Sequence, residues 1–321
     1  MKNLIAAACL AATCLSGNAF AQGVDALSAK VNSEDADRFV AVFERTGGKP
    51  TAEDLLKGYL ELGSKGVQVF TPGRIVNAEN LAQKIAANPD SYRRAIDVCL
   101  PIAKDMTAEL RSVYLGLNGL LNSPELPELF VLFGGGNSGG TAGPGAQVLG
   151  LEVICRIGKD EEDIRGIFRS FFAHETVHTL QNFPSQFPER GEDYLILAVL
   201  AEGGADFVAS LVTGQPPEKA RDEWAVERED YIKAEFLKDL EKAKGMTTEE
   251  IQKAGSPLYR WVRNSTSAPD EGWPGELGYW VGRQIWTDYF NQAEDKAAVL
   301  KQLLDLDNID PAHISSVYFG K

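Results

Sequence analysis

The sequence predicts a mainly α-helical fold with a small β-sheet (α+β). Apolar residues recur at helical spacing over most of the chain, and helix-starting and helix-stopping residues separate these repeats. Only two short runs, 129–133 and 148–154, have the β-branched and aromatic content typical of strands. The 321 residues are enough to bury a large core in one domain or in two lobes.

The first 21 residues have the pattern of a secretory signal peptide. Lys2 precedes an apolar run from residue 4 to residue 15, and the Ala-Phe-Ala sequence at 19–21 fits a cleavage site. The apolar run is too short for a membrane span. We therefore expect cleavage after Ala21 and a periplasmic or secreted protein without stable membrane insertion. A lipoprotein is the less favoured alternative, because no convincing lipobox precedes a cysteine.

The mature chain is strongly acidic. Removal of residues 1–21, which include Lys2 and no acid, takes the formal net charge from −14 to −15. This charge disfavours nucleic acid and anionic membranes as partners. Two cysteines remain, Cys99 and Cys155, and an exported compartment permits a disulfide between them. Two buried free thiols are an equally open alternative.

The N-terminal part of the chain is predicted to be helical. Ser33 is placed to cap a first helix, which ends near the glycines at 47–48. Residues 51–54 (Thr-Ala-Glu-Asp) fit a capping box for a helix that continues through Leu62. Further helices are expected between residues 78 and 121. This part of the chain carries no specific functional signal.

A glycine-rich stretch, 134–145, separates the two predicted strands. It is not followed by G-K-[ST], and a strand rather than a helix comes next. These two features disfavour a nucleotide site and favour a flexible hairpin connection. The second strand, 148–154, is expected to lead straight into the next helix. Such a strand can bind an extended peptide by edge pairing.

The next helix, predicted over 160–183, carries the motif around which the chain is organised. Four acids at 160–163 suit a helix N-terminus, and the apolar face then continues into titratable residues. These are His174, Glu175 and His178, in the pattern H-E-x-x-H. On a helix the two imidazoles lie one turn apart and can bind one zinc ion, while Glu175 can act as general base on a metal-activated water. A structural metal site and a chance match are the alternatives.

A second helix, predicted over 194–212 and ended by Gly214, is apolar except for two acids. Its acids, Glu202 and Asp206, lie one turn apart, and with two glycines between them they argue against a membrane span. A catalytic zinc ion needs a third protein ligand, for which Glu202 is the candidate. Asp206 is placed to accept a hydrogen bond from a ligand imidazole. A buried polar network unrelated to metal is the alternative for this pair.

The remaining chain is also predicted to be helical. A long charged helix is expected over 218–244, mostly as a solvated face, and another over 276–290. The polar C-terminal tail should be helical as well.

The chain resembles the gluzincins, the thermolysin-like zinc metallopeptidases, because H-E-x-x-H is followed by Glu-x-x-x-Asp on a second predicted helix. It looks most like a poorly characterised bacterial family of predicted zinc-dependent proteases, through Gly-Gly-Thr-Ala at 139–142, Ala-Glu-Gly-Gly-Ala-Asp-Phe at 201–207 and Gly-Tyr-Trp-Val-Gly at 278–282. The metzincin pattern is absent, because no histidine follows His178 before His313.

The resemblance implies a two-lobed zincin-like fold and one zinc ion per chain. It implies that His174, His178 and Glu202 bind zinc, that Glu175 is the general base and that Asp206 supports a ligand.

The resemblance also calls for a side chain that steadies the oxyanion. Tyr279 is the candidate, and Arg283, one turn on, is a candidate for binding a substrate carboxylate. A core aromatic and a surface ion pair are the alternatives for these two residues. The metallopeptidase region is expected over 126–321, after a helical region at 22–125. A single continuous domain formed by both regions is the alternative.

The expected function is that of an exported zinc metallopeptidase acting on a peptide or protein substrate. Another amide hydrolase, for instance one acting on cell-wall peptide, is an alternative within the enzymes. A zinc-containing binding or assembly protein without turnover is the alternative from another class. A glutamate at 175 favours an enzyme, since a binding site has no need of a base.

Overall fold

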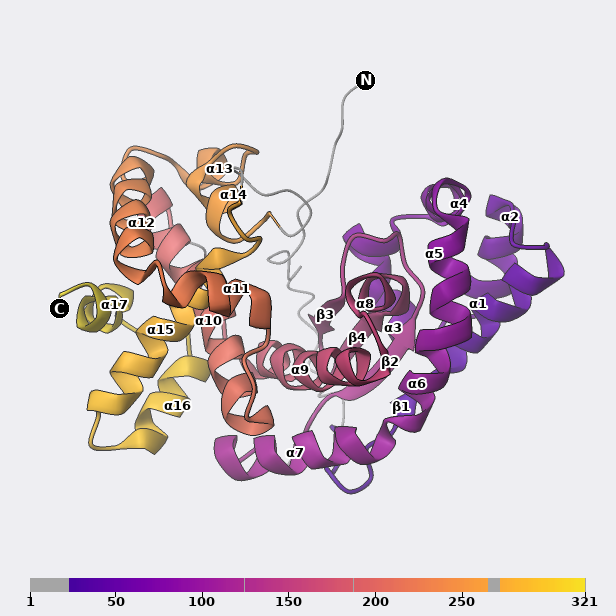
Figure 1. Ribbon diagram of the computed structural model, residues 1–321, viewed down its shortest axis with the longest axis horizontal. Helices are drawn as coiled ribbons and strands as arrows, with labels where there is room; N and C mark the ends of the chain where they lie inside the picture. Colours follow the sequence, from indigo (N-terminus) through magenta and orange to yellow (C-terminus); the bar gives the residue numbers. More distant parts are fainter. Residues whose placement is uncertain (1–22, 124, 187, 265–271, 321) are drawn as a thin grey trace. The chain divides into compact units, whose positions relative to one another are not determined.

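The computed structural model describes residues 23–123, 125–186, 188–264 and 272–320; the predicted signal peptide lies outside these ranges. The fold is mainly α-helical with one small four-stranded sheet, which confirms the predicted fold class (Figure 1). The chain divides into two compact units, one that ends at Thr179 and one that begins at Leu180.

The sheet belongs to the first unit and has the strand order β1-β2-β4-β3. The two central strands, β2 (Glu128–Leu132) and β4 (Ala146–Gly150), are parallel. The short strand β1 (Val31–Asn32) pairs in parallel with β2. On the other side β3 (Gly140–Gly143) pairs antiparallel with β4, so that β3 is an edge strand of the described sheet. The strand predicted at 129–133 is therefore confirmed.

The strand predicted at 148–154 is wrong in its second half. β4 ends at Gly150, and a helix, α8 (Leu151–Ile157), follows at once. In the sequence, α8 therefore lies between β4 and the histidine helix. Residues 151–155 are all buried, and a short apolar run that is buried throughout has no periodicity to distinguish strand from helix. The strand expected at the sheet edge is an inner strand, and the edge is instead formed by β3, in the glycine-rich stretch.

Helices cover the sheet of the first unit, with α3 against β2, β3 and β4, and α1 against β2. Three of the helical segments, labelled η, have π-helical hydrogen bonding. The helical segments between β1 and β2 are α1 (Glu34–Arg45), α2 (Ala52–Leu55), η1 (Leu56–Leu60), α3 (Lys65–Phe70), η2 (Thr71–Ile75), α4 (Ala78–Ala87), α5 (Pro89–Arg94), η3 (Ala95–Cys99), α6 (Leu100–Asp105) and α7 (Thr107–Leu121).

Two helix starts test the capping predictions. Thr51 and Asp54 form the predicted capping box at α2, although the helix changes to π geometry at Leu56. Ser33 precedes α1 as predicted, but its side chain makes no capping hydrogen bond. Its hydroxyl donates instead to Asp37 at 3.3 Å.

A disulfide joins Cys99 to Cys155, with their Cα atoms 5.7 Å apart. It connects η3 to α8 and resolves the choice between a disulfide and two free thiols. Because 56 residues separate the two cysteines, the bond closes a long loop of the unfolded chain.

Two helices carry the residues of the predicted metal site. The histidine helix is α9 (Glu161–Leu180), and the apolar helix is α10 (Gly191–Thr213), which ends at Gly214 in the left-handed conformation. Both predicted helices are confirmed. α10 is long and apolar enough to cross a membrane by length and composition, but it is buried over most of its length within the protein.

The prediction of a single charged helix over 218–244 is wrong. The segment forms two helices, α11 (Lys219–Val226) and α12 (Glu229–Ala243), separated by Arg228 with φ −127°. The break has a packing reason, because α11 contacts α15 whereas α12 contacts α10. The helix predicted over 276–290 is confirmed as α15 (Leu277–Gln292). The other helices of this unit are α13 (Thr248–Ile251), α14 (Pro257–Trp261), α16 (Lys296–Leu304) and α17 (Pro311–Phe319).

Glycines allow α10 and α15 to cross in backbone contact. A Cβ atom at Gly203 would lie closer than 3.0 Å to the backbone of Gly282, and one at Gly282 would lie equally close to the carbonyl of Val199. No side chain fits at either position without moving a helix. The crossing therefore fixes the segment of α10 that carries Glu202.

Candidate metal centre

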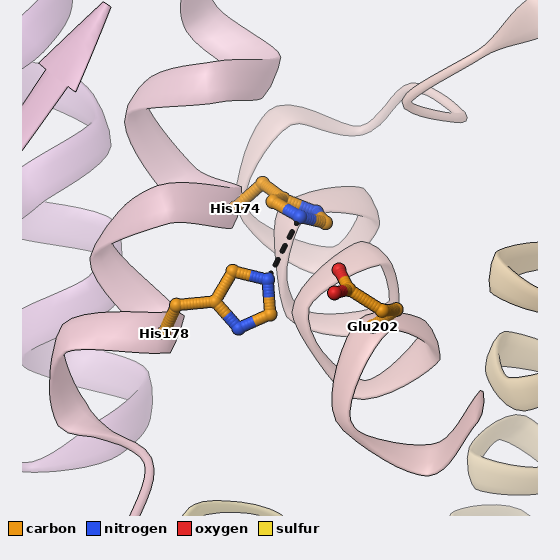
Figure 2. Close-up of side chains that lie close together, drawn as sticks. All are labelled: His174, His178 and Glu202. Carbon is orange, nitrogen blue, oxygen red and sulfur yellow. Dashed lines mark hydrogen bonds between the residues drawn. The ribbon is translucent and has the colours of Figure 1, made fainter. Parts of the chain in front are cut away.

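His174 and His178 extend from one face of α9, one helical turn apart. Their Nε2 atoms are 3.0 Å from each other, and the two rings are nearly perpendicular, with an interplanar angle of 84°. Figure 2 shows both rings turned towards the same point. This is the arrangement predicted from their spacing of four residues.

Glu202 of α10 completes a group of three ligand residues. One atom each from His174, His178 and Glu202 lies within 4.8 Å of the others, and this is the only such group of three found in the described parts of the chain. The Glu202 carboxylate faces the two imidazoles in Figure 2. Glu202 is only 5% exposed, and a buried carboxylate needs a compensating positive charge or hydrogen bonds.

The geometry fits a zinc ion. Two nitrogen ligands at about 2.0–2.1 Å from a tetrahedral zinc lie about 3.3 Å apart, close to the observed separation of the two Nε2 atoms. Two histidines and one glutamate are a ligand set of catalytic zinc sites, which keep a fourth position open. The residues present could therefore hold a catalytic zinc ion.

Glu175 lies between the two histidines in sequence and is 7% exposed. Its side chain packs directly on the backbone of Gly140, the first residue of β3. A Cβ atom at Gly140 would lie 2.8 Å from both Cγ and Cδ of Glu175, so only glycine fits there while the Glu175 side chain stays in place. The contact restricts where the carboxylate can lie.

On the side of α9 away from the two histidines, a buried polar side chain of the sheet forms hydrogen bonds to the helix. Gln147 of β4, fully buried, donates from Nε2 to the hydroxyl of Thr176 at 2.7 Å and to that of Tyr114 at 2.8 Å. Thr176 in turn donates to the carbonyl of Phe172. Gln147 and Thr176 escaped the sequence analysis, in which the predicted strand began at residue 148, one position after Gln147.

Asp206 lies one turn after Glu202 on α10 and is bound by an arginine that the sequence analysis missed. Arg221 of α11 donates from Nη2 to Oδ2 of Asp206 at 2.5 Å, and each side chain is only 3% exposed. Arg221 also donates from Nη1 to the carbonyl of Glu276. It was missed because it stands in a charged run that predicts a solvated face.

Tyr279 and Arg283, both on α15, are held by neighbouring charges. The guanidinium carbon of Arg221 lies 5.4 Å from the centre of the half-buried Tyr279 ring. Arg283 donates to Asp222, and the two side chains are 13% and 12% exposed. Burial raises the pKa of the Asp222 carboxyl, although Arg283 opposes this shift. Arg283 therefore has a carboxylate partner within the protein.

The comparisons with known proteins found no relative of this chain. No family model matches the chain, and neither the curated proteins nor the solved structures give a match. The assignment of the metal centre therefore depends on the geometry of His174, His178 and Glu202.

Proposed function

We propose that this protein is a zinc-dependent hydrolase that cleaves peptide bonds. The observation that carries the proposal is the group of His174, His178 and Glu202, with a further carboxylate, Glu175, beside the two histidines on the same helix. Three ligands suffice to hold zinc, so the fourth residue, the acid Glu175, is available for proton transfer.

The roles follow from the chemistry of these side chains. A zinc ion bound by the three ligands would polarise the substrate carbonyl and lower the pKa of a water molecule to about 7. Glu175 accepts the proton of the attacking water and passes it to the leaving amine. Its packing on Gly140 keeps the carboxylate in one region, which reduces the entropy lost on reaching the reactive arrangement.

The sheet edge supports a peptide as substrate. β3 pairs with β4 on one side and is an edge among the described strands, with Thr141 to Gly143 partly exposed. An extended peptide can add to such an edge through main-chain hydrogen bonds. Gly140, at the start of the same strand, contacts Glu175, so a peptide bound along β3 would pass close to the base.

The gluzincin resemblance remains part of this proposal. It assigns Asp206 to support of a ligand histidine, and Tyr279 to stabilising the oxyanion by donating a hydrogen bond. Arg283 is the weaker assignment, because the guanidinium already pairs with Asp222. Export after cleavage at Ala21 is supported by the disulfide, since such bonds persist in oxidising compartments.

Glu175→Gln tests the proposal. The amide keeps the size of the side chain but cannot accept the proton, so zinc content and folding should persist while hydrolysis of a denatured protein substrate falls by at least about 100-fold. A chelator should abolish the wild-type activity, and added zinc should restore it. Glu162→Gln, the same change at an exposed position of α9, is the matched control and should be fully active.

Two results would contradict the proposal. Equal rates for wild type and Glu175→Gln would remove the assigned base. A wild type that binds zinc but cleaves nothing in a broad peptide library would favour a binding or assembly protein, or a hydrolase of another amide.

A further inference from the structure

The loop of residues 134–139, which connects β2 to β3, is organised by a buried acid of α8. Glu152 is 1% exposed, and its carboxylate accepts hydrogen bonds from the backbone N–H groups of Gly134 and Gly136, at 3.0 to 3.1 Å. A loop rich in glycine has many conformations, so fixing it has a large entropic cost. Bonds from two backbone donors to one carboxylate offset part of that cost.

Other contacts also hold the loop of residues 134–139 in place. Arg156, one turn after Glu152 on α8, donates to the carbonyl of Gly136 at 3.2 and 3.3 Å. The hydroxyl of Tyr92 donates to the carbonyl of Gly134 at 2.7 Å. The disulfide through Cys155 anchors α8 itself to η3. The loop is thus bound at several points to α8, which the disulfide anchors, and at one further point to α5.

The end of this loop lies against the proposed base. A Cβ atom at Gly139 would lie 2.6 Å from the ring of Phe171, and one at Gly140 would meet the Glu175 side chain. Phe171 and Glu175 are one turn apart on α9. A shift of the loop would therefore either press on the Glu175 side chain or leave it unsupported.

We propose that Glu152 is a positioning residue for Glu175: its carboxylate holds loop 134–139, and the loop holds Gly140 against the side chain of the base. This inference rests on the proposed function, because it assigns Glu175 as the base. It adds a residue that touches neither substrate nor metal and acts only through the backbone of the loop. Nothing in the motif itself points to Glu152, which is 23 residues before Glu175.

Glu152→Gln tests the positioning role. The amide has one acceptor oxygen and turns an N–H₂ donor towards backbone donors, so the loop loses part of its support. We expect kcat to fall about 10- to 100-fold, the scale of a small misplacement of a catalytic group, with KM and zinc content unchanged. Hydrogen exchange at residues 134–140 should accelerate in the same samples. Glu162→Gln, an equal charge change at an exposed site, should change none of these quantities.

A double variant separates positioning from a general loss of structure. If Glu152 acts through Glu175, adding Glu152→Gln to Glu175→Gln should lower kcat no further, because residues that act as a unit are not additive. An equal fold-loss in both backgrounds would overturn the positioning role. Unchanged exchange at residues 134–140 would overturn it as well, and this measurement needs no substrate.

Gly140→Ala approaches the same contact from the other end and leaves Glu152 intact, which covers a Glu152→Gln variant that fails to fold. The added methyl displaces the Glu175 side chain, so kcat should fall while zinc content persists; a wild-type kcat would overturn the inference. A wild type without hydrolytic activity would overturn the proposed function and the positioning role together. If the wild type is active and Glu152→Gln has the same kcat, only the positioning role is overturned.

Discussion

Arg221 forms a fully buried ion pair with Asp206, in which each side chain is 3% exposed and Nη2 lies 2.5 Å from Oδ2. The same guanidinium donates to the carbonyl of Glu276 and lies over the ring of Tyr279. One arginine thus connects the α10 carboxylate next to Glu202 with the start of α15. The position of Tyr279 depends on the same guanidinium as that of Asp206.

Arg221→Met should destabilise the protein strongly, because it leaves the Asp206 carboxylate buried without its ion-pair partner. We expect the free energy of unfolding to fall by about 3–5 kcal/mol, measured by urea denaturation. Lys57→Met breaks an exposed ion pair with Glu53 and should cost no more than about 1 kcal/mol. Equal losses in the two variants would mean that the buried pair has no special role.

Purified protein should contain about one zinc ion per chain, and His174→Ala or His178→Ala should remove it. The expectation follows from the two Nε2 atoms that face one point on α9. Metal analysis after dialysis measures the content. His313→Ala, a change at an exposed histidine of α17, is the control and should keep the metal. Stoichiometric zinc in the His174→Ala/His178→Ala double variant would show that the ligands lie elsewhere.

Glu202→Gln should weaken zinc binding more than Asp206→Asn does. The first change removes the charge of a direct ligand, whereas loss of a residue that orients a ligand typically costs about 10- to 100-fold in affinity. Competition with a chromophoric chelator gives both dissociation constants. Wild-type affinity in Glu202→Gln would contradict its assignment as the third ligand and with it the gluzincin-like arrangement.

Removal of the disulfide should lower the free energy of unfolding by about 4 kcal/mol in the chain-entropy estimate for a loop of this length. Cys99→Ser/Cys155→Ser, compared with wild type by urea denaturation under non-reducing conditions, measures the loss. Because neither cysteine lies on α9 or α10, the helices that carry the proposed ligands, zinc content should stay the same in the variant. A stability equal to that of the wild type would mean that the crosslink does not restrict the unfolded chain.

Local patterns predicted the elements that carry the candidate site. The spacing of His174 and His178, the acids before them and Gly214 after α10 are short-range signals, and α9 and α10 lie where these signals place them. The grouping of Glu202 with the histidines was predicted because a catalytic zinc ion needs a third protein ligand, the resemblance implied the same residue, and the geometry supports it.

What the sequence could not predict depends on contacts between distant segments. Three of the four residues of β3, two glycines and one alanine, have low strand propensity, and the strand forms because β4 pairs with it. From the sequence, α8 cannot be distinguished from a continuation of the strand, because a segment that is buried on all sides lacks the helical periodicity of apolar residues. Arg221 stands in a charged run and Glu152 in a short apolar run, and the sequence alone does not show that either side chain is buried and hydrogen-bonded.

The apolar character of α10 has a consequence for the chain before it folds. A segment of 23 residues that could partition into a lipid bilayer is exposed in the newly made protein. Glu202 and Asp206 each oppose that partitioning by about 2.5–3.5 kcal/mol if ionised at the middle of the helix. The same two acids that are assigned to the proposed metal centre thus also oppose insertion of the unfolded segment into a bilayer. Replacing either by an apolar residue would both damage the site and favour misinsertion or aggregation, which is why the amide variants are the cleaner probes.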